Sequence, residues 1–151
     1  MASGEVHREL VSARGTKECW EILTDPHRVA SWVDVVDSVE ELEPLAAYQG
    51  VLQDRVGPFQ LRADLSITVT ELADEQLIRF VAEGEDRQVG SRLHIDAGMR
   101  LSPGEKGGSL LQFSGSYKVE GRIATLGDAM IHKKATAAFE QFLENAAQET
   151  Q

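Results

Sequence analysis

A regular alternation of apolar and polar residues between Phe59 and Val69 constrains the fold more than any other feature of the sequence. The apolar or small positions are Phe59, Leu61, Ala63, Leu65, Ile67 and Val69. Because successive side chains of a β-strand point to opposite faces, this pattern predicts a long strand with one buried face. A polar face that meets water directly is typical of antiparallel sheets.

The same alternation recurs along most of the chain. It predicts further strands over residues 5–11, 35–42, 48–56, 76–83, 92–101 and 111–119. Helical spacing replaces it over residues 16–24, in a short helix that starts at Asp25-Pro26 and ends near Trp32, and over residues 122–147. We therefore predict a single α+β domain over residues 1–151. In it, a curved antiparallel sheet of six or seven strands wraps one long carboxy-terminal helix, and two short helices follow the first strand.

The apolar stripe of the long helix is not straight. One line of apolar residues consists of Ile123, Leu126, Gly127, Met130 and Ile131. A second line, rotated around the helix axis, consists of Ala135, Ala138, Phe139, Phe142 and Leu143. Lys134 and Gln141 lie on the continuation of the first line. If the domain encloses a ligand cavity, we expect the first half of the helix to line it and the second half to be ordinary core.

Charge and motif content exclude several functions. The chain has 15 Lys and Arg against 25 Asp and Glu, a net charge of −10 that disfavours nucleic acid as a partner. No apolar run is long enough for a membrane span and no signal peptide is present, so we expect a cytoplasmic protein. Cys19 stands alone and the four histidines are scattered. The sequence therefore assigns no catalytic residue, no metal and no cofactor.

The residues expected to face inward form the candidate ligand-binding set. They are Trp32, Leu52, Phe59, Leu61, Phe80, Leu93, Ile95, Met99, Phe113, Tyr117, Leu126, Gly127, Met130 and Ile131. By residue type alone they fit a filled core as well as a cavity. Tyr117 adds a polar tip that could orient a carbonyl or hydroxyl group while its ring stays buried.

Two groups of residues carry a family resemblance. The segment TKECWEILTDPHRVASW resembles the opening of the START-like, helix-grip superfamily SRPBCC, in which a Trp on the first helix is followed by Leu-x-Asp-Pro. Val56-Gly57-Pro58 before a long alternating strand, and GRIATLG before Met130-Ile131, resemble the carbon monoxide dehydrogenase G-subunit family within it.

The resemblance implies a deep apolar cavity between the sheet and the long helix. It implies a non-catalytic binding module for a lipid- or quinone-like molecule, accessory to a redox enzyme, a molybdenum hydroxylase of the carbon monoxide dehydrogenase type. A polyketide cyclase-like enzyme is an alternative that needs a buried ionisable group, for which Asp54, Arg55 and Tyr117 are weak candidates. A protein-interaction domain with a filled core is the third hypothesis.

Overall fold

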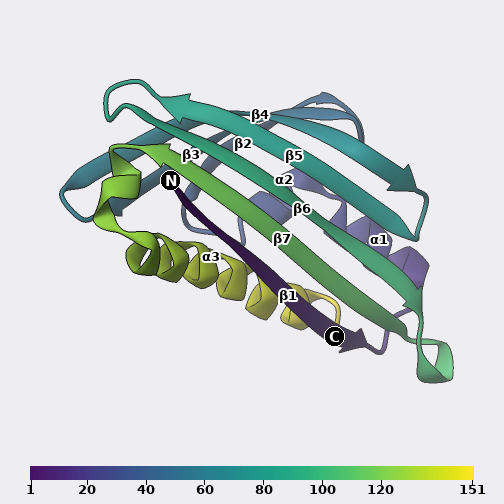
Figure 1. The fold of residues 1–151 in the computed structure, drawn as a ribbon. Helices are drawn as coiled ribbons and strands as arrows, with labels where there is room; N and C mark the ends of the chain where they lie inside the picture. The colour runs from purple at the N-terminus through teal and green to yellow at the C-terminus, as the bar shows by residue number, and fades with distance from the viewer.

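The computed structural model describes residues 1–151 and contains one antiparallel sheet of seven strands (Figure 1). Its elements are β1 Ala2–Ser12, α1 Thr16–Leu23, α2 Pro26–Ala30, β2 Val36–Glu43, β3 Ala47–Val56, β4 Phe59–Ala73, β5 Leu77–Asp86, β6 Ser91–Pro103, η1 Glu105–Gly107, β7 Ser109–Gly121, η2 Ile123–Leu126 and α3 Asp128–Glu149. The strand order is β1-β7-β6-β5-β4-β3-β2, which puts β1 and β2 at opposite edges. The predicted helix-grip α+β fold is confirmed.

The strands lie where the alternation predicts them, with small differences at their ends. The largest difference is in β4, which continues to Ala73, beyond the predicted end at Val69. The pairing of β4 with β5 shifts register between Val69 and Glu71. Such a bulge interrupts the alternation of faces, so the sequence pattern stops while the strand goes on.

The predicted single helix over residues 122–147 is wrong at its start. Residues Ile123–Leu126 form the 3₁₀-helix η2, and α3 begins at Asp128. Gly127 separates the two with φ 98° and ψ 154°, a conformation that favours glycine. Periodicity alone misses this break, because Gly127 falls on the apolar line of an uninterrupted helix.

Two buried clusters of side chains lie on the inner face of the sheet, and α3 contributes to both. The Ile131 cluster consists of Ala2, Val56, Leu61, Ala63, Leu65, Ala82, Val89, Tyr117, Val119, Ile123 and Ile131. The Leu143 cluster consists of Cys19, Trp20, Ile22, Leu23, Trp32, Met99, Leu101, Leu111, Phe113, Leu143 and Ala146. Helices α1 and α2 therefore cover the same face of the sheet as the second half of α3.

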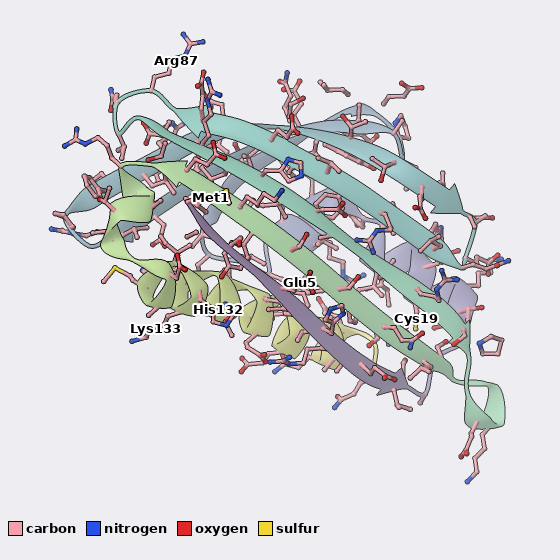
Figure 2. All side chains as sticks on the ribbon, in the orientation of Figure 1. Met1, Glu5, Cys19, Arg87, His132 and Lys133 are labelled. Atoms are coloured by element: carbon pink, nitrogen blue, oxygen red, sulfur yellow. The ribbon has the colours of Figure 1, made fainter.

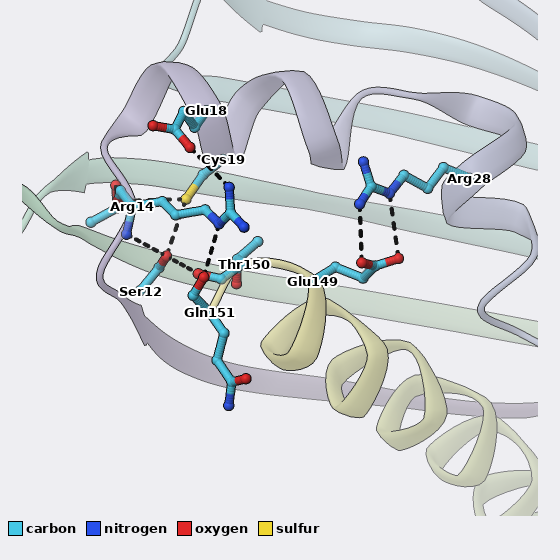
Figure 3. Close-up of polar contacts among 9 residues, drawn as sticks. Ser12, Arg14, Glu18, Cys19, Arg28, Glu149, Thr150 and Gln151 are labelled. Atoms are coloured by element: carbon cyan, nitrogen blue, oxygen red, sulfur yellow. Dashed lines mark hydrogen bonds and ion pairs between the residues drawn. The ribbon is translucent and has the colours of Figure 1, made fainter.

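Hydrogen bonds attach the carboxy-terminal end of α3 to β1 and the loop after it (Figure 3). The hydroxyl of Ser12 donates to the carbonyl of Thr150 and accepts from the backbone N–H of Arg14 at 3.0 Å. The Arg14 Nε donates to the carbonyl of Gln151 at 2.9 Å. The buried Cys19 lies in the same corner, with its Sγ 3.5 Å from the Ser12 Oγ.

Candidate ligand-binding site

A cavity of about 520 Å³ lies between the concave face of the sheet and α3. It is lined by 43 residues, of which 32 are hydrophobic. Small residues explain part of the empty space: Ala97 and Gly115 lie side by side on β6 and β7, and α3 presents Ala135 and Ala138. Where both walls carry small side chains, the space between them stays unfilled.

Nine of the candidate residues lie around this cavity. They are Leu52, Leu61, Phe80, Leu93, Ile95, Met99, Phe113, Tyr117 and Ile131. All except Ile131 belong to strands, and their inward orientation follows from the period-two alternation. The other five candidates lie outside the lining.

The outlying residues have structural positions of their own. Trp32 is buried in the Leu143 cluster, with its ring centroid 5.8 Å from that of Phe142. The guanidinium of Arg122 stacks over the ring of Phe59 at 5.6 Å. Gly127 forms the break before α3.

Leu126 and Met130 lie beside the turn between β3 and β4. Both side chains approach Gly57, and that of Met130 is 40% exposed. These two residues, predicted as lining, instead pack over one end of the sheet, because the break at Gly127 changes the direction of the chain before α3.

The sequence predicted that the second half of α3 is ordinary core, but part of it also lines the cavity. Ala138, Phe139 and Phe142 all line the cavity, whereas Leu143 and Ala146 are buried away from it. The rotated apolar line accounts for this, because it brings Phe142 against the ring of Phe113 on β7, 5.3 Å between centroids. The cavity therefore extends along more of α3 than predicted.

A further part of the wall comes from α2, β2 and the loop between them, which the candidate set missed. These residues are Val29, Ala30, Val33, Val35, Val36 and Val39. The signal was present in the sequence, since the valines from Val33 to Val39 are interleaved with acidic residues. Such alternation with acidic side chains is also typical of the solvated face of a surface strand, so it does not by itself indicate a cavity wall.

Both tyrosine hydroxyls at the cavity are engaged by the protein. The Tyr117 hydroxyl lies 2.8 Å from Nδ1 of His132 on α3, and the Tyr48 hydroxyl accepts from the backbone N–H of Leu45 at 2.9 Å. Burial raises the pKa of Tyr117, and the charge of Asp128 raises it further. Tyr117 therefore stays protonated, and its hydroxyl joins β7 to α3. Its role in orienting a carbonyl or hydroxyl group of a ligand stays a prediction.

An ion pair joins the sheet to the helix at the cavity. Nζ of Lys134 on α3 lies 3.4 Å from Oδ2 of Asp54 on β3, and both residues line the cavity. The Asp54 side chain is 25% exposed and that of Lys134 is 45% exposed. Arg55, the neighbouring candidate for an ionisable group, is not part of the lining.

A second hollow of about 620 Å³ lies over β1, β5, β6 and β7, and its lining is different in character. Only 3 of its 10 lining residues are hydrophobic. Arg79 in its wall already pairs with Asp96 at 2.8 Å and with Ser114 at 2.9 Å. The apolar cavity under the sheet is therefore the better candidate for a ligand site.

No group of three or more His, Cys, Asp or Glu side chains is placed to hold a metal ion. No helix combines the length and the apolar character that a membrane crossing requires.

A curved antiparallel sheet that grips one long helix over an apolar cavity defines the START-like, helix-grip class of α+β proteins. The chain belongs to the CoxG family, that of the carbon monoxide dehydrogenase G subunit, whose model matches residues 10–151. The family resemblance seen in the sequence is thereby confirmed. No curated protein matches the chain by sequence.

Solved structures show the same fold at low sequence identity. A conserved protein from Geobacillus kaustophilus has a TM-score of 0.80 and 21% identity, over 98% of this chain and 94% of that one. A START superfamily protein from Mycobacterium smegmatis has a TM-score of 0.67 and 12% identity, over 97% and 96%. Ara h 8.0201 has a TM-score of 0.57 and 11% identity, over 97% and 99%. At these identities the likeness concerns the fold.

Proposed function

We propose that this protein is a non-catalytic binding module that holds an apolar, lipid- or quinone-like molecule between its sheet and α3. The observation that carries the proposal is the cavity of about 520 Å³, in whose lining 32 of 43 residues are hydrophobic. A volume of this size suits a small molecule, and burial of an apolar ligand surface against such a lining is favourable.

Membership of the CoxG family supports the second part of the proposal, an accessory role beside a molybdenum hydroxylase of the carbon monoxide dehydrogenase type in the cytoplasm. In that role the module would supply or remove an apolar molecule that the redox enzyme cannot draw from water. The cavity favours this function over an interaction domain with a filled core, because a filled core would leave no comparable volume.

The first test is extraction of the purified protein with organic solvent, followed by mass spectrometry of whatever was bound. We expect a stoichiometric apolar molecule. A protein that repeatedly yields none, and that also fails to bind an apolar fluorescent dye, would contradict the proposal.

The second test fills the cavity from one wall. Ala138 lines the cavity, whereas its neighbour Ala137 is exposed. We expect Ala138→Phe to lower the affinity for the dye at least tenfold and Ala137→Phe to leave it unchanged. Since both variants place Phe at adjacent positions of the same helix, helix propensity acts alike on both. Equal affinities would show that the dye binds elsewhere.

A further inference from the structure

Charged residues are rare in the cavity lining, and two of them face each other. The charged lining residues are Asp54, Lys118 and Lys134. Lys118 is exposed and lies between the inward-facing Tyr117 and Val119 on β7, so its side chain belongs to the outer face of the sheet. Asp54 and Lys134 are therefore the pair that brings charge to the ligand site.

Both residues interrupt apolar stripes that line the cavity. Asp54 lies between Leu52 and Val56 on the inner face of β3, and Lys134 lies one turn from both Ile131 and Ala138 on α3. Lys134 is also one of two polar residues on the apolar line of the helix. The other, Gln141, accepts a hydrogen bond from the backbone N–H of Asp34 and so has a structural partner.

A contribution to stability hardly explains the Asp54–Lys134 pair, because an ion pair at this exposure adds little to the free energy of unfolding. Its hydrogen-bonding capacity is only partly used. Oδ1 of Asp54 accepts from the backbone N–H of Arg55 at 2.8 Å, which fixes the carboxylate and turns Oδ2 to Lys134. An ammonium group has three donors, and Asp54 is the only partner of Lys134. Lys134, which lines the cavity, thus has donors without a protein partner.

We propose that Lys134 and Asp54 select the polar end of the ligand: Lys134 donates to a neutral carbonyl-type oxygen, and Asp54 excludes carboxylates. The inference rests on the proposed function and deepens it. A neutral oxygen can accept from the ammonium while Asp54 keeps the pair charge-balanced. A carboxylate would bring a second negative charge next to Asp54 and would be repelled. The site therefore takes uncharged amphiphiles in preference to fatty acids.

The experiment compares three probes of equal chain length at neutral pH: decane, the methyl ketone and decanoate, each displacing an apolar dye. The wild-type protein should prefer the ketone to decanoate. Lys134→Met should lower the affinity for the ketone about tenfold, since a hydrogen bond from a charged donor is lost. It should leave the affinity for decane unchanged. Asp54→Asn should raise the affinity for decanoate about tenfold, because Lys134 then lacks a counter-ion.

The matched control is Lys133→Met. Lys133 is exposed and adjacent to Lys134 in the sequence, and the Lys133 side chain points away from the sheet (Figure 2). It should change none of the three affinities. If decane binds but Lys134→Met leaves the preference for ketone over decane intact, or Asp54→Asn leaves decanoate as weak as before, the selection by this pair is refuted and the apolar site stands. If none of the probes binds the wild-type protein, the inference falls together with the proposed function.

Discussion

The two halves of α3 differ in what holds them. In residues 128–138 only Ile131 is buried, and the run from His132 to Lys134 is exposed. In residues 139–149, Leu143 and Ala146 are buried, and Phe142 lies against three aromatic rings. One continuous helix is thus fixed to the core along its second half, whereas residues that line the cavity lie on both halves, from Ile131 to Phe142. We infer that stability depends mainly on the second half and ligand selection on the first.

The largest expected effect is the loss of a buried side chain in the second half. Leu143→Ala should lower the free energy of unfolding by about 2–5 kcal/mol, because Leu143 is 5% exposed and its removal leaves a cavity in packed core. Urea denaturation measures this. Dye affinity under native conditions should not change, since Leu143 is not part of the cavity lining. A loss below about 1 kcal/mol would remove the contrast between the halves.

The next effect concerns the attachment of the carboxy-terminal end. Ser12→Ala should destabilise the protein by about 1–3 kcal/mol, because the carbonyl of Thr150 and the N–H of Arg14 both lose a buried partner. Ser3→Ala on the exposed face of β1 is the control. Equal unfolding midpoints for the two variants would mean that packing alone holds this end of α3.

A smaller effect should depend on pH. Arg28 Nη2 lies 3.0 Å from Oε2 of Glu149 (Figure 3), and this hydrogen bond is the main cause that lowers the pKa of Glu149 below its ordinary value, partly opposed by desolvation. A pKa lower in the folded than in the unfolded state gives stability that is complete above the unfolded value and disappears as pH falls through the folded one.

Arg28→Gln should therefore lower the Tm slightly at neutral pH and have no effect once Glu149 is protonated. Thermal melts of both proteins across the acidic range would show the two curves converge. A difference in Tm that persisted unchanged into acid would assign the effect of Arg28 to packing of its stem instead.

The smallest effect is expected in the first half of the helix. Met130→Ala removes a side chain that is 40% exposed, so the free energy of unfolding should change by about 0.5 kcal/mol or less. Dye affinity should also stay the same, because Met130 lies outside the cavity lining. A decrease in the free energy of unfolding comparable to that of Leu143→Ala would show that both halves of α3 contribute equally to the packed core.

Residue periodicity predicted the strands well, together with the strand side chains that face inward, because alternation along a strand fixes which face each side chain takes. It placed Ile95 and Phe113 in the cavity wall for this reason. It failed where the backbone conformation breaks the pattern: Gly127, with its positive φ, separates residues 123–126 from the expected helix, and Leu126 and Met130 lie away from the cavity. It could not find the pairing of Asp54 with Lys134, since the two residues are 80 positions apart in the sequence and only the closed fold brings their side chains within 3.4 Å.

The pairing of the first strand with the last has a consequence for how the chain acquires its structure. Ala2 lies opposite Val119 and Ser12 opposite Ser109, so β1 has no neighbour until β7 exists. Contacts between residues this distant in sequence form slowly, because a long loop must close, at a cost in chain entropy, before the contacts stabilise the fold. During synthesis the strands β2 to β6 can pair with sequential neighbours as they leave the ribosome, while β1 stays unpaired until β7 has been made. The amino-terminal edge is therefore among the last parts of the sheet to close, although it is made first.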